Sequence, residues 1–287
     1  MKRIALIALA AAVVAAAPAL AHPGSAIVVD RSGRVYFIDT GSGLWRIEAG
    51  GKLTRIPGPA FHWMTLDQGD TFGRLQLPSG PGWEIDRAGS DPTLLLSSDF
   101  PLAIGGDGNL YYPSQGGSGP RRIFRVQPSG TSSVLAQVPL PWLNGLAAGP
   151  DGALYYTGNS EVHRIGKDGA VSTVAEHVAP PGCVAIPGND PNEGPLLRSI
   201  AVDARGTLYV TASGCGSLLK ITPAGQVTVL LQLQSPWSPT GVALHGDTLY
   251  VLEYLHTAVE DRGLWLPRVR RLTPDGRSAI VAAITRP

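Results

Sequence analysis

Two residues near the C-terminal end, Glu253 and His256, stand three positions apart and could do acid–base chemistry. A histidine beside a carboxylate can act as a general base with its orienting partner, and the same pair can bind a metal ion. Their spacing in a loop fixes no geometry, so a purely structural role also stays open.

Further polar candidates are spread along the chain: Asp39, His62, Asn144 and Arg198. Brought together with Glu253, they would supply two carboxylates, an imidazole, an amide and a guanidinium, which suits a polar pocket floor. The alternative is a set of channel residues satisfied by bridging water.

Three tryptophans, Trp63, Trp142 and Trp237, stand close to these polar residues in the sequence. A ring of indoles could wall an apolar or sugar-like ligand, and packing between structural units is the alternative use. Together the nine residues named so far form our candidate ligand-binding set.

An internal repeat supplies the elements that position these residues. Six segments share one template, in which a short apolar strand and a turn, with glycine in five copies, precede a strand that usually opens with an aromatic residue. The segments begin at Ala26 (AIVVDRSGRVYFID), Met64 (MTLDQGDTFGRLQL), Leu102 (LAIGGDGNLYY), Gly145 (GLAAGPDGALYY), Ser199 (SIAVDARGTLYV) and Gly241 (GVALHGDTLYV). The turns recur every 35 to 54 residues, and two further strands follow in each copy. This pattern predicts an all-β, six-bladed β-propeller of four-stranded antiparallel blades, whereas a β-sandwich would lack such a period.

The face of the propeller where the inner strands begin, called the top, should carry any site. The short Gly/Pro/Asp turns fall on the opposite face, and the long segments around 115–120, 177–197 and 254–266 fall on top. The residues that precede the inner strands should ring the channel mouth: Ser25, His62, Phe100, Asn144, Arg198 and Thr240. The ends of the second strands should form another ring: Asp39, Ser114, Gly158, Ala212 and Glu253. Asp39 and Glu253 would be neighbours if blades six and one meet.

The repeat, G-[IV]-A-V-D-x-x-G-x-L-Y-V followed by I-x-x-x-G, resembles NHL-type repeats. It also resembles the six-bladed propellers of the gluconolactonase/regucalcin family, the strictosidine synthases and virginiamycin B lyase, over 26–284. In the gluconolactonase family a divalent metal is held by a Glu, an Asn in an N-G-[LI] motif and an Asp. Asn144-Gly145-Leu146 matches the Asn motif, but Ser25 and Arg198 stand where the carboxylates would be. Because a cation site needs converging oxygens, the departure predicts no metal cofactor; calcium belongs only to the lactonase alternative. The resemblance to lyases implies His and Glu at the top face, and that to strictosidine synthases implies a Glu base, for which Glu253 is the match.

Composition and charge narrow the partners. Only 16% of residues are charged, and the chain holds 36 Gly and 25 Pro, which argues against a helical bundle. Without Lys2 and Arg3 the 23 basic side chains fall to 21, against 22 acidic ones. Such a balance gives no basic field for nucleic acid. We expect a monomer that takes a small polar molecule, a glycan or a protein at its top face.

The first 21 residues look like a secretory signal peptide. Lys2 and Arg3 precede the apolar run 4–17, and Ala19-Leu20-Ala21 fits a signal peptidase site before His22. No later segment is long enough to cross a membrane. The expected product is one propeller domain, 22–287, in the periplasm or secreted.

The two cysteines, Cys183 and Cys215, both follow the leader. In an oxidising compartment an isolated pair most often forms a disulfide. This one would tie the long loop before blade five to that blade.

Two classes of function remain at this point. The first is a non-catalytic NHL-type module that binds a ligand or partner on its top face. The alternative is a hydrolase or lyase, acting on an ester or lactone, with its site at the channel mouth. An anion or polar ligand beside Arg198 is expected in either case.

Overall fold

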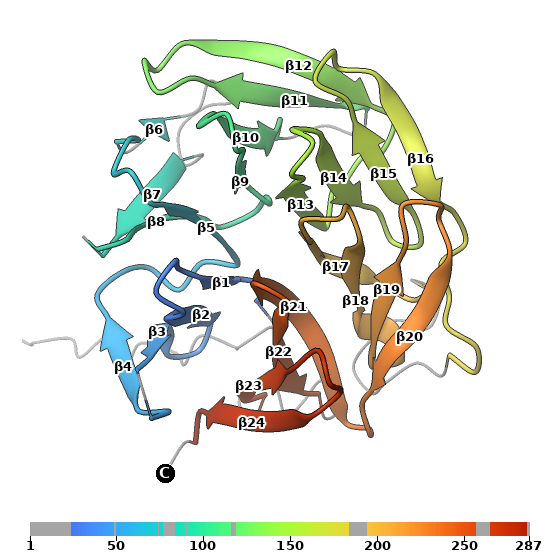
Figure 1. The fold of residues 1–287 in the computed structure, drawn as a ribbon. Helices are drawn as coiled ribbons and strands as arrows, with labels where there is room; N and C mark the ends of the chain where they lie inside the picture. Colours follow the sequence, from blue (N-terminus) through green and yellow to red (C-terminus); the bar gives the residue numbers. More distant parts are fainter. Residues whose placement is uncertain are drawn as a thin grey trace, which may run out of the picture.

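The chain forms six four-stranded antiparallel sheets arranged around a central axis (Figure 1). The computed structural model describes residues 24–48, 50–73, 75–76, 84–89, 91–115, 119–183, 194–256 and 265–285. Apart from a short 3₁₀ helix, Ser213–Cys215, its regular elements in these ranges are strands. The predicted six-bladed, all-β propeller is confirmed. The proposed leader, 1–21, lies outside the described residues.

Each blade is made from one continuous stretch of chain, as the sequence predicted. Blades one and two hold β1 (Ile27–Val29), β2 (Val35–Asp39), β3 (Gly43–Ile47), β4 (Leu53–Ile56), β5 (Trp63–Asp67), β6 (Leu75–Gln76), β7 (Glu84–Ala88) and β8 (Thr93–Ser97). Blades three and four hold β9 (Ala103–Ile104), β10 (Leu110–Pro113), β11 (Arg121–Val126), β12 (Ser132–Val138), β13 (Gly145–Ala148), β14 (Leu154–Thr157), β15 (Val162–Ile165) and β16 (Val171–Ala175). Blades five and six hold β17 (Leu197–Val202), β18 (Leu208–Ala212), β19 (Ser217–Ile221), β20 (Val227–Gln232), β21 (Trp237–His245), β22 (Thr248–Leu255), β23 (Pro267–Leu272) and β24 (Ser278–Ala283).

Blade two departs from the strand order of the others. In five blades the strands pair in chain order, but the second sheet runs β5-β8-β7-β6. The expectation that the segment after Gly73 pairs with the inner strand is therefore wrong. The reason is burial: Leu94, Leu95 and Leu96 of β8 are fully buried, which suits the place beside the inner strand. The two-residue β6 is left at the edge.

The core is divided among the six seams between blades. Six hydrophobic clusters fill them, one in each seam. Between blades six and one, for example, Phe37 packs with Leu252 and Tyr254. The alternation of side chains along each strand sends successive residues into opposite seams, so every blade contributes to two clusters.

Ring closure depends on this packing, because within the described residues the first and last blades exchange no strand. A hydrogen bond adds to the side-chain contacts of this seam. The hydroxyl of Tyr254 in blade six donates to the carbonyl of Ile38 in blade one, at 3.0 Å. Both groups lie in the buried seam.

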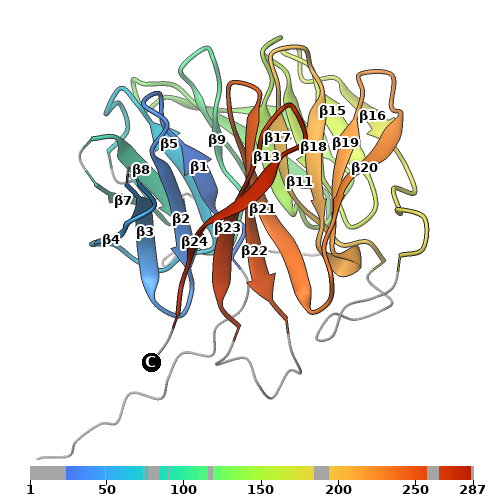
Figure 2. The ribbon, with the colours of Figure 1, turned by 60° about the horizontal axis from the view of Figure 1, so that its bottom comes forward.

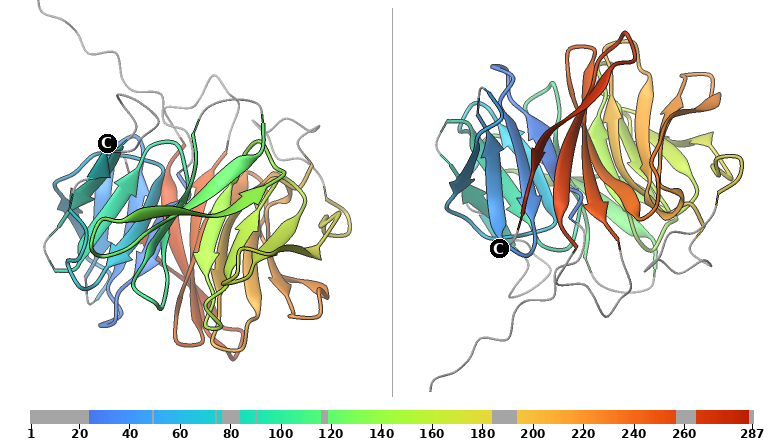
Figure 3. Two further views of the ribbon diagram at one scale, coloured as in Figure 1. Left: turned by 90° about the horizontal axis from the view of Figure 1, so that it is seen from above. Right: turned by 90° about the horizontal axis from the view of Figure 1, so that it is seen from below.

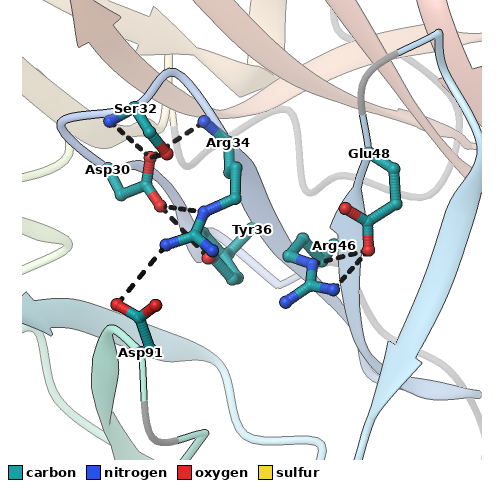
Figure 4. Close-up of polar contacts among 7 residues, drawn as sticks. All are labelled: Asp30, Ser32, Arg34, Tyr36, Arg46, Glu48 and Asp91. Carbon is teal, nitrogen blue, oxygen red and sulfur yellow. Dashed lines mark hydrogen bonds and ion pairs between the residues drawn. The ribbon is translucent and has the colours of Figure 1, made fainter.

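The strands run along the channel, so the turns gather at its two ends (Figures 2 and 3). A turn of the bottom face shows how these ends are held (Figure 4). The Asp30 carboxylate accepts hydrogen bonds from the Ser32 hydroxyl at 2.7 Å, from Arg34 Nε at 2.5 Å and from the Tyr36 hydroxyl at 3.2 Å. Arg34 also lies 3.6 Å from Asp91 in blade two. The Asp30 carboxylate thus orders the turn, and the arginine that it holds, Arg34, lies near Asp91 of the next blade.

The Cys183–Cys215 disulfide is present, with a Cα–Cα distance of 5.0 Å. It joins the segment before blade five to the 3₁₀ helix that follows β18. This bond fits a non-cytoplasmic compartment. Among the described residues, no helix has the length and apolar character needed to cross a membrane.

Candidate active site at the mouth of the central channel

A cavity of about 350 Å³ runs down the central channel, and the inner strands of all six blades line it. Apolar side chains such as Met64, Leu102 and Val242 line it, but more of its surface is polar than apolar. Ser25 and Ser199 add hydroxyl groups toward the top. A hollow that combines apolar side chains with polar groups can take a small polar molecule.

Arg198 supplies the positive charge at the top of this channel. It lies in β17 where the pairing with β18 shifts register between Leu197 and Ile200, and such irregularities re-aim side chains. Burial lowers the pKa values of His62 and His256, and the Arg198 guanidinium lowers both further. Arg198 therefore acts electrostatically on imidazoles from blades two and six at once.

His256, which follows β22, is an almost fully buried imidazole with an exposed fraction of 2%. Among the described residues, neither Nδ1 nor Nε2 has a hydrogen-bond partner. The ring packs against Trp265, with 4.7 Å between ring centroids. Burial, helped by Arg198, lowers its pKa to about 3. His256 is thus a neutral imidazole at physiological pH, and a buried polar group left without a partner calls for a functional explanation.

His62 precedes β5 and is held differently. Its Nδ1 lies 2.5 Å from the carbonyl oxygen of Ser98. A carbonyl can only accept, so Nδ1 carries the proton of the neutral ring and Nε2 keeps a lone pair. Burial is the main cause that lowers its pKa, against the opposing effect of the Ser98 carbonyl. His62 is therefore a second neutral imidazole with a fixed tautomer.

Asn144 stands at the start of blade four, where the sequence placed it. Its side-chain Nδ2 donates to Oδ1 of Asn159 at 2.9 Å, and its backbone N–H donates to Thr157. The neighbouring Gly145 has no room for a side chain, because a Cβ there would collide with the backbone oxygen of Arg198. This close approach fixes blade four against the strand that carries Arg198.

Asp39 and Glu253 face different seams, so the expected carboxylate pair at the mouth is not formed. Asp39 lies two residues after Phe37 and shares its face of β2, which faces blade six. Glu253 lies two residues after Val251 and shares its face of β22, which faces blade five. Asp39 accepts hydrogen bonds from the Ser42 hydroxyl and the Gly41 N–H in the β2–β3 turn.

Glu253 is fully buried and its two carboxylate oxygens are each 2.5 Å from an arginine Nε, one from Arg268 and one from Arg270. Both oxygens of this carboxylate accept from guanidinium donors, so the structure shows a buried ion pair at Glu253. Sequence reasoning missed this clamp, although the alternation of Arg268 and Arg270 on β23 is a signal for it: residues two apart share one face of a strand.

The three tryptophans do not form a ring. Trp63 lines the channel cavity. Trp142 lies on the surface with 53% of its area exposed. Trp237 is covered by the guanidinium of Arg268, 3.5 Å from its ring centroid. Of the three, Trp63 thus contacts the channel cavity.

Comparison with known families places this site in context. Residues 106–254, just over half of the chain, match the model of the SMP-30/gluconolactonase/LRE-like region. The chain belongs to this family. Among known proteins, this gluconolactonase-like chain is 29% identical over 194 residues to virginiamycin B lyase from Nocardia farcinica, covering 67% of the chain. The match spans 59% of the length of that curated relative.

The solved structure of a regucalcin supports the fold of the gluconolactonase-like chain. Regucalcin from Agrobacterium tumefaciens, described as a calcium-binding protein, matches with a TM-score of 0.57 and 17% identity, over 82% of each chain. A virginiamycin B lyase from Staphylococcus aureus matches with a TM-score of 0.48 and 18% identity, over 93% of this chain and 71% of the other.

The donors at the family's metal-ligand positions do not fit a divalent cation in this gluconolactonase-like chain. Arg198 brings a positive charge to one of these positions and Ser25 a neutral hydroxyl to another, so the amide oxygen of Asn144 lacks carboxylates beside it at these positions. Within the described ranges, no three His, Cys, Asp or Glu side chains gather as a ligand set. The residues at the mouth instead offer neutral imidazoles and a guanidinium, which suit proton transfer and the binding of negative charge.

Proposed function

We propose that this chain is an exported enzyme that cleaves an ester or lactone at the mouth of its central channel, by hydrolysis or elimination. The observation that carries the proposal is the buried, unpartnered imidazole of His256 beside the charge of Arg198. Support for an enzyme rather than a non-catalytic binder comes from the gluconolactonase family match and from the lyase relative.

Each residue has a distinct part in this proposal. Both reactions need a base to remove a proton, from water in hydrolysis or from carbon in elimination, and both build negative charge on oxygen. His256 is the base; its lowered pKa keeps the ring unprotonated at neutral pH and also makes it a weaker base than a free imidazole. Arg198 stabilises the developing oxyanion.

The test is turnover of a panel of aldonolactones, aryl esters and cyclic depsipeptides. We expect His256→Gln and Arg198→Ala each to lower kcat/KM by about 100-fold or more. His163→Gln is the matched control, because His163 is also buried but lies in blade four, bonded to Glu161. Incorporation of ¹⁸O from water would identify hydrolysis, and a new C=C bond would identify elimination.

The pH profile gives a second readout. A histidine base with the ordinary pKa of about 6.5 loses activity as pH falls through that value. The lowered pKa of His256 moves the loss to lower pH, so activity should persist below pH 6. Full activity in His256→Gln, or no turnover of any substrate class, would contradict the proposal.

We also propose that catalysis needs no bound calcium. The guanidinium of Arg198 would repel a cation at the position where relatives place a carboxylate. Protein purified without chelator should contain less than one calcium per chain by elemental analysis, and EDTA should leave both the melting temperature and the activity unchanged. One tightly bound calcium per chain would overturn this and restore a metal-dependent lactonase.

A further inference from the structure

A tyrosine–cation pair recurs near the bottom face of the propeller. In five blades a tyrosine on the second strand lies directly opposite an arginine or lysine on the third. These pairs are Tyr36–Arg46, Tyr111–Arg125, Tyr155–Arg164, Tyr209–Lys220 and Tyr250–Arg271. The recurrence allows each blade to serve as a reference for the others.

In two of these blades the cation is neutralised by a carboxylate. Arg46 Nε donates to Glu48 at 2.7 Å in blade one (Figure 4). Arg164 Nη2 lies 2.7 Å from Asp151 in blade four. In these two blades the arginine is thus bonded to a carboxylate of its own blade.

Arg125 of blade three differs. Within the described part of the chain it forms no ion pair, and its Nε is buried without a hydrogen-bond partner. Its guanidinium makes a long hydrogen bond, 3.5 Å from Nη2 to the Ser133 hydroxyl. The nearby carboxylate of Asp107 is engaged by the Tyr111 hydroxyl at 2.6 Å and by Asn109 Nδ2 at 2.7 Å.

A cavity of about 500 Å³ opens at this arginine, in the bottom of the seam between blades three and four. Blade four contributes Lys167, which has no carboxylate partner among the described residues. The lysine stem lies over Gly152, where any side chain would collide with it. Two cations therefore line the cavity against one carboxylate, that of Asp107, which is already hydrogen-bonded.

We propose that this cavity binds an oxyanion, the phosphate or carboxylate group of a small molecule. Arg125 would offer its planar fork of donors, and Lys167 a mobile point charge. The ligand would lie beside Arg125 as Glu48 lies beside Arg46 in blade one, because Asp107, the counterpart of Asp151 in the repeat, is already bonded to Tyr111 and Asn109. The site lies at the opposite end of the propeller from the candidate active site, so it stands or falls separately from the proposed reaction.

Isothermal titration with inorganic phosphate and with citrate, at constant ionic strength, tests the site. The wild-type chain should bind at least one of the two anions saturably at a single site. Arg125→Gln should weaken that binding at least tenfold, Lys167→Gln should weaken it less, and Arg125→Lys should restore part of it. Arg164→Gln is the matched control, because this arginine pairs with Asp151 and does not line the cavity.

Equal affinity in wild type and Arg125→Gln, or no saturable binding of either anion, would overturn the proposal. If Arg125→Gln does not fold, Lys167→Gln decides, because Lys167 is an exposed turn residue. Binding of phosphate alone or of citrate alone would support the site and identify the group it selects.

Discussion

Replacing Glu253 with alanine should lower the free energy of unfolding by about 3–5 kcal/mol. The carboxylate is completely buried and bonded to both Arg268 and Arg270. Without it, two guanidinium groups with exposed fractions of only 19% and 16% lose their counter-charge. Denaturation in urea, followed by tryptophan fluorescence, measures the loss, and the large penalty comes from leaving charges buried and uncompensated.

Asp275→Ala is the control for this variant. Asp275 forms an ion pair with Arg277 at the surface. The Arg277 side chain is 85% exposed and the Asp275 side chain is 52% exposed. Exposed pairs contribute little, so unfolding should hardly change. Equal effects of the two substitutions would show that the Glu253 clamp does not stabilise blade six.

Removing the disulfide by the double substitution Cys183→Ser and Cys215→Ser should cost about 3–4 kcal/mol on the chain-entropy model. The bond closes a loop with a sequence separation of 32 residues, and opening it enlarges the unfolded ensemble. Urea denaturation of the wild type with and without reductant, beside the double variant, measures the effect.

Two checks make this result specific. The reduced wild type should match the double variant, because both lack the same crosslink, and the variant should not respond to reductant. Two free thiols titrated in the unreduced, unfolded wild type would contradict the bond itself. An unchanged unfolding free energy would show that the crosslink does not stabilise the folded chain.

Local patterns explain how much of the fold the sequence predicts. The repeat predicts the strand order of five blades because each is a series of adjacent hairpins. The residues of a hairpin are close in the sequence, so local patterns identify it. Blade two escapes this reasoning. Its strand order depends on which segment is buried beside β5. The apolar run Leu94–Leu96 of β8 takes this place, although the less apolar β6 is nearer in the sequence.

For the candidate site, too, local patterns predict the positions of residues but not their partners. The places of Asn144 and Arg198 follow from aligning the repeats, because the inner strands begin at equivalent points. The partners of these groups do not follow, since they depend on cross-strand register and on which seam a side chain enters. Thus Glu253 looks like a base in the sequence, yet its pairing with Arg268 across β22 and β23 turns it into a buried structural ion.

The strand order of blade two has a consequence for how the chain assembles during synthesis. In the other blades each strand can pair with the one made just before it. The inner strand β5 instead ends at Asp67, and its partner β8 begins at Thr93. The hairpins β6–β7 and β7–β8 can form first, and β5 then pairs across the intervening residues. The entropy cost of closing such a loop comes before the gain from pairing. Blade two therefore adds its inner strand last, whereas the neighbouring blades begin with their inner strands and add the outer ones.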